Sequence, residues 1–181
     1  MNRRDQILDS AAELFARHGF HGVSIADLGA ACGVTGPALY KHFRGKQAIL
    51  AAMLVGISEE LLAEGRRRVR AAYDDKAALD ALIDWHVSFA LEHEALIVVQ
   101  DRDWAALPVE AREKVRETQR KYVEVWVKVL RGLRPDLKPK AARAMVHAAF
   151  GLINSTPHSA LVPADEMSEV LATMARAALL A

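Results

Sequence analysis

An all-α fold is predicted for this chain of 181 residues, and three observations lead to it. Apolar residues recur at helical spacing, whereas no clear strand-type alternation stands out. Alanine and leucine are abundant and only 6% of the residues are aromatic, a composition that favours helices. Prolines and glycines separate the helical segments from one another. The length fits a small N-terminal head on a helical body, which we place at residues 1–47 and 48–181.

Charge and cysteine content narrow the class of protein. The net charge is only +1, so charge alone does not indicate a nucleic-acid partner. The single cysteine, Cys32, excludes an intramolecular disulfide and fits a reducing compartment. We find no continuous apolar core of a signal peptide and no uncharged apolar stretch of about 18 residues that could span a membrane. The expected location is therefore the cytoplasm.

The head begins with a helix expected from Arg3 to His18, which Gly19 ends in the usual C-terminal glycine position. Ser24 and Asp27 follow with the spacing of a capping box. In that arrangement the serine oxygen accepts from the backbone and the carboxylate reaches back to the start of the helix. A second helix is therefore expected to begin at this serine.

A third helix is expected after a turn at Gly33, with Thr35 as its cap, Pro37 in its first turn and Phe43 near its end. Two short helices joined by a tight turn that contains glycine form a helix-turn-helix, whose second helix fits the DNA major groove. The segment 24–43 is therefore predicted to read DNA. The residues predicted to contact DNA are Ser24, Thr35, Gly36, Pro37, Tyr40, Lys41, His42 and Lys46.

The side chains of this segment suit a duplex. Hydroxyl groups of Thr35 and Tyr40 and the ammonium of Lys41 are able to bond phosphates, and Pro37 is able to touch a thymine methyl group. Lys46 starts the next helix, whose N-terminus itself favours a phosphate. Two alternatives stay open at this point: a serine-capped helix and a glycine turn occur in many helical proteins, and Tyr40 could instead shield the turn.

The same segment carries a family resemblance, which covers about residues 3–55. The residues concerned are Phe20, Val23, Ser24, Ile25, Ala26, Ala30, Gly33, Val34, Thr35, Ala38, Leu39, Tyr40, Lys41, His42, Phe43, Lys46, Ile49 and Leu50. In this pattern the chain resembles the TetR family of bacterial regulators. The resemblance implies an all-helical homodimer that binds operator DNA, with a variable C-terminal domain for a small molecule. Many members carry a basic residue where this chain has Gly36, so no base contact by that side chain is expected.

The body is expected to consist of further helices at about 46–73, 75–92, 95–103, 108–132, 140–154 and 164–180, with a loop between Pro157 and Pro163. The segments 140–155 and 164–180 are rich in small and apolar residues. They resemble the two dimerising helices of the family, which form a four-helix bundle across the twofold axis. The alternative interpretation is ordinary intramolecular core.

Candidates for an effector site share an aromatic or polar character and lie in the body: Trp85, Phe89, Trp104, Tyr122, Trp126, His147 and Asn154. Such aromatic residues are also common in plain core. The segment 154–158 resembles a stretch of family members linked to fatty-acid and acyl-thioester metabolism. An acyl-CoA would require cations near its site, for which Arg66, Arg67, Arg68 and Arg70 are candidates unless they form a solvated helix face.

The function predicted from these features is a transcriptional repressor that a small-molecule effector, such as an acyl-CoA or another apolar ligand, releases from its operator. The alternative is a DNA-binding regulator without a small-molecule ligand, controlled by a protein partner. A closed cavity lined by Trp85, Phe89, Tyr122 and Trp126 would favour the first, and a solidly packed body the second. Because no metal-ligand spacing, phosphate loop or nucleophile elbow is present, neither an enzyme nor a metal or other cofactor is expected.

Overall fold

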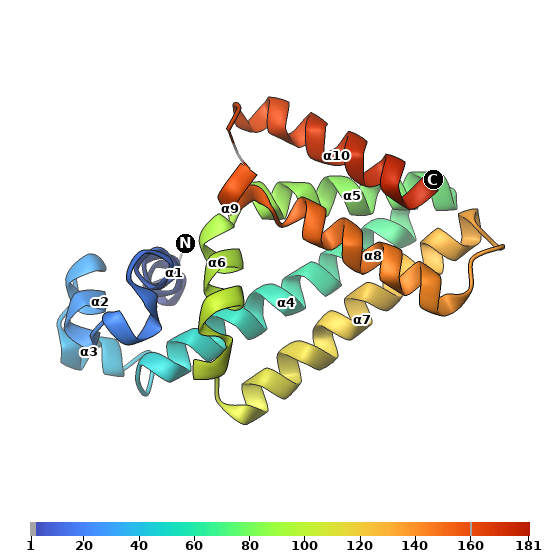
Figure 1. Cartoon of the computed structure of the whole chain (residues 1–181). Coiled ribbons are helices and arrows are strands. Elements are labelled where there is room, and N and C mark those ends of the chain that lie inside the picture. The colour runs from blue at the N-terminus through green and yellow to red at the C-terminus, as the bar shows by residue number, and fades with distance from the viewer. Residues whose placement is uncertain (1–2, 160) are drawn as a thin grey trace. The chain divides into compact units, whose positions relative to one another are not determined.

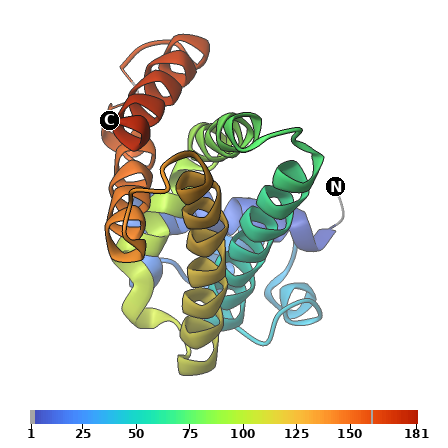
Figure 2. The ribbon, with the colours of Figure 1, turned by 90° about the vertical axis from the view of Figure 1, so that its right-hand side faces the viewer.

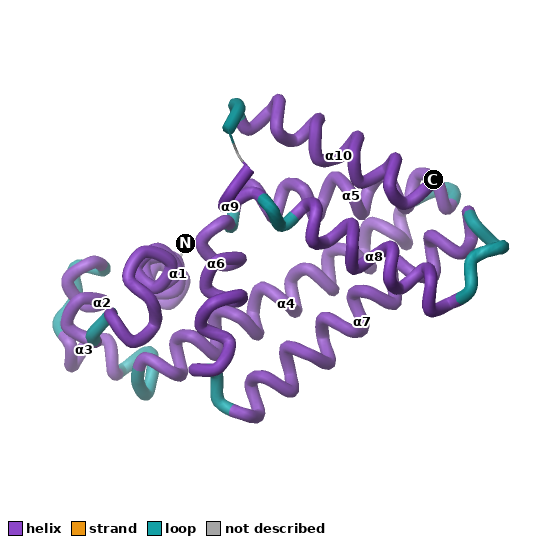
Figure 3. The backbone as a smooth tube through the Cα atoms, viewed as in Figure 1, coloured by secondary structure: helices purple, strands orange, loops and turns teal. Residues whose placement is uncertain are grey.

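The computed structural model describes residues 3–159 and 161–181, and this part of the chain is helical and without strands, as predicted (Figures 1 and 3). Its elements are α1 (Arg3–Gly22), α2 (Ile25–Ala31), α3 (Gly36–Tyr40), α4 (Lys46–Ala71), α5 (Asp75–Glu92), α6 (Glu94–Asp103), the 3₁₀ turn η1 (Trp104–Ala106), α7 (Val109–Leu133), α8 (Pro139–Ile153), α9 (Thr156–Ser159) and α10 (Ala164–Leu180). None of the described helices combines the length and the apolar character needed to cross a membrane.

The chain forms two compact units, and the long helices α4 and α7 contribute residues to both. The first unit contains the chain up to Ile57 together with Ala95–Arg116, and the second contains Ser58–Glu94 and Glu117–Ala181. The helix-turn-helix thus shares a compact unit with α6, which follows it by more than fifty residues in the sequence. The long helices α4 and α7 each begin in the first unit and end in the second.

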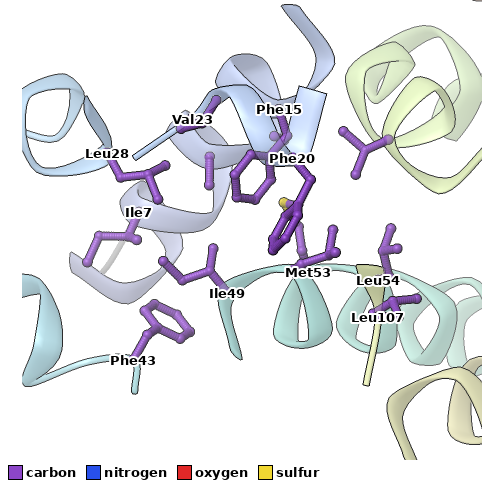
Figure 4. Packing of buried hydrophobic residues seen from close by; sticks show 14 of the residues in the cluster. Ile7, Phe15, Phe20, Val23, Leu28, Phe43, Ile49, Met53, Leu54 and Leu107 are labelled. Carbon is purple, nitrogen blue, oxygen red and sulfur yellow. The ribbon is translucent and has the colours of Figure 1, made fainter. Parts of the chain in front are cut away.

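A continuous apolar core holds the first unit together (Figure 4). It joins side chains of α1, the helix-turn-helix, the first half of α4 and the segment around η1. Its members shown in the figure include Ile7, Phe15, Phe20, Val23, Leu28, Phe43, Ile49, Met53, Leu54 and Leu107. Removing one such large side chain from water stabilises a fold by about 1.5–3 kcal/mol, so this core fixes the position of α2 on α1 and α4.

The end of α1 is held by a charged pair from α6. Gly19 has a φ of +76°, which ends the regular helix there, as its sequence position predicts, and a further short turn reaches Gly22. Beside this kink, the buried carboxylate of Asp103 accepts a hydrogen bond from the Phe20 amide at 3.2 Å. The guanidinium of Arg102 donates to the carbonyls at the end of α1 and pairs with Asp103 at 3.1 Å. Helix α6 therefore caps α1.

The core of the second unit places α10 against both α5 and α8, and Figures 1 and 2 show α10 in red beside α8 in orange. The stripe that α10 buries repeats every fourth residue, as expected for one face of a helix. Its members are Met167, Leu171, Ala175 and Leu179. An ion pair of 2.7 Å between Arg176 and Asp80 joins α10 to α5.

Two boundaries differ from the sequence prediction. Helix α3 ends at Tyr40, three residues before the predicted end, because the amides of Lys41 and His42 turn back to carbonyls three residues earlier instead of continuing the α-helix. The predicted loop before Pro163 contains the short helix α9, in which Pro157 occupies the first turn, where a missing N–H is tolerated.

Candidate nucleic-acid interface and effector site

The predicted capping box is present at the start of α2. The Asp27 amide donates to the Ser24 hydroxyl oxygen at 3.1 Å, and the Ser24 amide donates to the Asp27 carboxylate at 2.8 Å. The Ser24 hydroxyl also donates to that carboxylate at 2.6 Å, and these bonds lower the pKa of Asp27. The box fixes the entry angle of α2, which a helix-turn-helix requires.

The turn between α2 and α3 depends on two glycines. Gly33 has a φ of +63°, a left-handed conformation that side chains rarely adopt. Gly29 lies within α2, and its carbonyl accepts from the Val34 amide at 2.8 Å. A β-carbon on Gly29 would stand 2.7 Å from the Val34 carbonyl oxygen, so the two helices approach backbone to backbone at this point.

Helix α3 presents most of its predicted contact residues to solvent. Thr35, Pro37, Lys41 and His42 are exposed, and Tyr40 leaves 55% of its surface free, which argues against a shielding role for that ring. Thr35 starts α3 without a side-chain capping bond, so its hydroxyl is available to another partner. Leu39 is the buried residue that fixes α3 to the core.

Gly36 has open space around it and an ordinary helical conformation. A β-carbon there would meet no atom within 4 Å, so the position could hold a side chain without disturbing the fold. The absence of one leaves the backbone of α3 free to approach a partner closely.

Lys46 has partners within the head. Its ammonium donates to the carbonyls of Phe20 at 2.6 Å and Val23 at 2.7 Å, and it lies 4.4 Å from the centre of the Phe20 ring. This side chain therefore ties the start of α4 to the segment that leads into α2. The structure gives this side chain an internal role that the sequence did not predict.

The second unit contains a buried cluster of aromatic rings around His86. The imidazole stacks on Phe150 with ring centres 4.3 Å apart, lies 5.7 Å from Tyr122 and meets Trp126 edge-on at 5.9 Å. Phe89 lies 5.8 Å from the same imidazole. Phe150 joins α8 to α5 and α7, and its sequence position gave no signal of this role.

Polar groups run through the centre of this cluster. The His86 Nε2 lies 3.2 Å from the Asn154 amide oxygen, and its Nδ1 lies 3.3 Å from the Tyr122 hydroxyl. Because an amide oxygen only accepts, Nε2 carries the proton and Nδ1 accepts from Tyr122. Burial raises the pKa of Tyr122, which keeps its hydroxyl protonated. Trp126 is also fully buried, and its Nε1–H makes no hydrogen bond of ordinary geometry with any described residue.

The structure brings together only part of the predicted effector set. Phe89, Tyr122, Trp126 and Asn154 meet around His86. Trp104 belongs to the first unit, where the Arg116 guanidinium lies 5.4 Å from its ring centre. His147 lies on the exposed face of α8, away from the buried stripe of that helix.

Trp85 occupies a different environment from its neighbour His86. It lines a pocket of about 530 Å³ between α4 and α5, together with Glu60, Ala63, Glu64, Arg67 and Arg70. The Arg68 guanidinium lies 5.3 Å from the centre of the Trp85 ring, and the Trp85 Nε1 donates to the Leu61 carbonyl at 3.4 Å. Of the four residues expected to line one closed cavity, three are packed in the ring cluster and Trp85 faces this open pocket.

Helices α8 and α10 leave small and apolar residues uncovered. On α8 these include Ala144, Ala148 and Gly151, and on α10 Val170 and Met174 are 42% and 51% exposed. A mostly apolar pocket of about 380 Å³ lies between the two helices, lined by Leu152, Ser155, Ser159, Val162, Met167, Val170, Leu171 and Met174. Within residues 3–159 and 161–181, no group of three or more potential metal ligands was found.

The buried imidazole predicts a pH dependence of stability. Burial lowers the pKa of His86 from 6.5 to about 4, so the folded state holds this ring neutral. Its contribution to stability is complete above pH 6.5 and is lost as the pH falls from 6.5 towards 4, because the unfolded chain takes up the proton first. We expect the free energy of unfolding to fall by about 2 kcal/mol between pH 7 and pH 5 on account of this group.

Urea unfolding followed by circular dichroism at both pH values measures this slope. The variant His86→Gln removes the titrating group, and its unfolding should lose about 2 kcal/mol less over the same interval. Equal pH slopes for both proteins would show that His86 is not the buried group responsible.

Comparisons with known proteins agree with this architecture. The family model of "bacterial regulatory proteins, tetR family" matches residues 7–53, which contain the helix-turn-helix, and the model "tetracyclin repressor-like, C-terminal domain" matches residues 72–158. A TetR-family transcriptional regulator from Bordetella parapertussis 12822 has the same fold, with a TM-score of 0.84, 28% identity, and coverage of 96% of this chain and 94% of that one.

Two further proteins extend the comparison. The HTH-type transcriptional repressor KstR2 of Rhodococcus jostii is 30% identical over 129 residues, which span 71% of this chain but only 63% of that protein. The transcriptional regulator FadR from Bacillus subtilis, solved in complex with stearoyl-CoA, shares the fold with a TM-score of 0.74 and 19% identity, over 94% of this chain and 96% of that one. The chain belongs to the TetR family of bacterial regulatory proteins.

Proposed function

We propose that this regulator is a repressor that an apolar small molecule of the acyl-CoA class releases from its operator. The observation that carries the effector is the row of polar groups buried among rings in the second unit, where His86 bonds Tyr122 and Asn154. Buried polar groups cost stability relative to apolar core, so their presence at the centre of a body is typical of a site for a ligand.

Operator contact is proposed for the exposed side of the helix-turn-helix. Tyr40, Thr35 and Lys41 would bond phosphates, while Pro37 and His42 would face base edges. Gly36 would let the backbone of α3 approach the groove, and specificity would then depend partly on DNA shape. The N-terminus of α4 at Lys46 would add a phosphate contact. The amide and the hydroxyl of Ser24 already donate to the Asp27 carboxylate, so a phosphate contact by Ser24 would require the capping box to open. In functional terms we place the DNA-binding domain at residues 1–47 and the effector and dimerisation domain at 48–181.

The dimer is proposed to form through residues 140–155 and 164–180. The exposed alanines and Gly151 of α8 would allow close helix packing, and the partner's side chains would fill the apolar pocket beside Val170 and Met174. A twofold dimer would place two copies of α3 on the two half-sites of one operator.

Two relatives support the two parts of this proposal. KstR2 carries the name of a repressor, and FadR of B. subtilis, a protein of the same fold, was solved in complex with stearoyl-CoA. The energetic requirement is that the effector binds the DNA-free state more tightly than the DNA-bound state, since only that difference shifts the equilibrium.

The test begins with an operator selected by the protein itself from a library of random duplexes. Electrophoretic mobility shifts with that duplex then follow the addition of isovaleryl-, octanoyl-, palmitoyl- and stearoyl-CoA, with free coenzyme A as the control. We expect at least one acyl-CoA to release the DNA and coenzyme A to leave it bound. Retention of the complex with every acyl-CoA would reject this effector class.

A regulator controlled by a protein partner is the second candidate. The packing of Phe89, Tyr122 and Trp126 around the His86 ring favours it, because these rings fill the space that a closed effector cavity would need. Thermal shift measurements separate the two candidates. A true effector at 100–1,000 times its dissociation constant stabilises the folded state by roughly 3–4 kcal/mol, whereas a regulator of the second kind shows no shift with any acyl-CoA.

A further inference from the structure

The four arginines at the end of α4 fall into two pairs with different partners. Arg67 and Arg68 both donate to the Glu64 carboxylate, at 2.6 Å and 2.7 Å, and these bonds lower the pKa of Glu64 to about 2. Arg66 and Arg70 have no such acidic partner in the described part of the chain and are exposed. Arg67 and Arg68 therefore share one carboxylate on the protein, whereas Arg66 and Arg70 have none among the residues described.

The unpaired arginines line a groove of about 370 Å³ between α4 and α7. Lys128 of α7 adds a third cation, and Asp75 at the start of α5 contributes one carboxylate. Three valines complete the lining, namely Val69, Val125 and Val129. Three cations against one carboxylate give the groove an excess of two positive charges above an apolar surface.

This combination of groups selects a class of ligand. Guanidinium groups bind phosphates through paired, charge-assisted hydrogen bonds, and a valine surface favours an apolar group next to that phosphate. Val69 lies one helical turn after Gly65 on α4, where Gly65 faces the Tyr122 ring of the buried cluster. An apolar chain that starts in the groove is therefore one turn from the rings around His86.

We propose that the groove lined by Arg66, Arg70 and Lys128 binds the phosphate-bearing end of an amphipathic effector, an inference that rests on the proposed acyl-CoA response. The acyl chain is directed towards the His86 cluster, and the coenzyme A phosphates stay at the groove. Arg67 and Arg68 do not take part, because Glu64 already occupies them.

The experiment compares two double variants with the same loss of charge on the same helix. Isothermal titration of the full-length protein measures the affinity for palmitoyl-CoA and for palmitate, which lacks the phosphates. Arg66→Gln with Arg70→Gln should weaken palmitoyl-CoA binding by about tenfold or more, and Lys128→Gln by a smaller factor. The matched control, Arg67→Gln with Arg68→Gln, should change the affinity by less than about threefold, and palmitate should bind all variants alike.

The outcomes separate this inference from the proposed function. If both double variants weaken palmitoyl-CoA binding equally, the ligand is attracted by surface charge in general. That result contradicts binding in the groove but leaves the proposed acyl-CoA response intact. If the unchanged protein binds no acyl-CoA, the proposed effector class fails, and the groove is then measured with dodecyl phosphate alone. If dodecyl phosphate binds the unchanged protein but not the variant Arg66→Gln with Arg70→Gln, the groove is supported as a phosphate site. If dodecyl phosphate does not bind, or binds both proteins equally, the groove proposal is wrong.

Discussion

Replacing Gly29 by alanine is expected to abolish operator binding and to destabilise the head. A β-carbon at this position would stand 2.7 Å from the Val34 carbonyl oxygen, 3.6 Å from the Gly36 amide nitrogen and 3.7 Å from the Thr35 carbonyl carbon. These are backbone atoms of the turn, so no side chain is able to rotate out of the way. The turn itself has to move, which breaks the 2.8 Å bond from the Val34 amide to the Gly29 carbonyl.

Two effects of opposite sign compete in this variant. Alanine is favoured over glycine inside a helix by about 1 kcal/mol, which would stabilise α2. Overpacking costs about 1–3 kcal/mol where neighbours are able to adjust, and a backbone neighbour adjusts least. We therefore expect net destabilisation, together with a change in the angle at which α2 presents α3. Operator affinity depends on that angle, so it should fall more than stability does.

The matched control is Gly36→Ala, which adds the same methyl group to a neighbouring helix where nothing lies within 4 Å. Its unfolding temperature should equal or exceed that of the unchanged protein. Circular dichroism during heating and mobility shifts with the selected operator measure both effects for Gly29→Ala. An unchanged unfolding temperature combined with unchanged operator affinity in that variant would contradict the close approach of the two helices.

Local signals in the sequence were sufficient for much of the head. The Ser24 and Asp27 spacing predicts the capping box, and the glycines at 19 and 33 stand where the backbone turns left-handed. Arg67 and Arg68 follow Glu64 by three and four residues, which is the spacing of helical ion pairs. The sequence could therefore have predicted that these two arginines are paired with an acid. Each of these features depends on residues within about one helical turn.

Features built by distant residues could not be predicted in the same way. Asp103 bonds the Phe20 amide across 83 positions, and an acid at the end of α6 gives no sign of that partner. Phe150 stacks on His86 only because α8 packs near α5. His147 and Asn154 are seven positions apart, a spacing that predicts one helical face. Asn154 instead lies at the C-terminal cap of α8, where its side chain contacts His86, while His147 stays exposed.

Gly65→Ala should destabilise the second unit and impair its response to an effector. The new β-carbon would lie 2.6 Å from Cε2 and 3.3 Å from Cδ2 of the Tyr122 ring. That ring is 3% exposed, and it is confined by the rings of His86, Phe150 and Trp126 with centres 5.7, 5.5 and 6.2 Å away. Movement of Tyr122 would also lengthen the 3.3 Å bond from its hydroxyl to the His86 Nδ1.

The same helix supplies a control with the opposite expected sign. Gly56 also lies within α4, and a β-carbon there would meet no atom within 4 Å. Gly56→Ala should therefore stabilise the protein by up to about 1 kcal/mol through helix propensity alone. Gly65→Ala carries the same gain but also the overpacking cost of about 1–3 kcal/mol, so the two variants should differ by that amount in urea unfolding.

A second substitution shows whether Tyr122 is the cause. Tyr122→Leu removes the ring atoms that the new methyl group would meet, and it carries its own cost because it leaves space in the cluster. In that background Gly65→Ala should no longer destabilise the protein, so the two changes should be strongly non-additive. Additive costs would place the clash elsewhere, for example on Leu82, whose Cδ2 would lie 3.4 Å from the same β-carbon. Non-additive costs would show that the absence of a side chain at residue 65 allows the Tyr122 ring to reach His86.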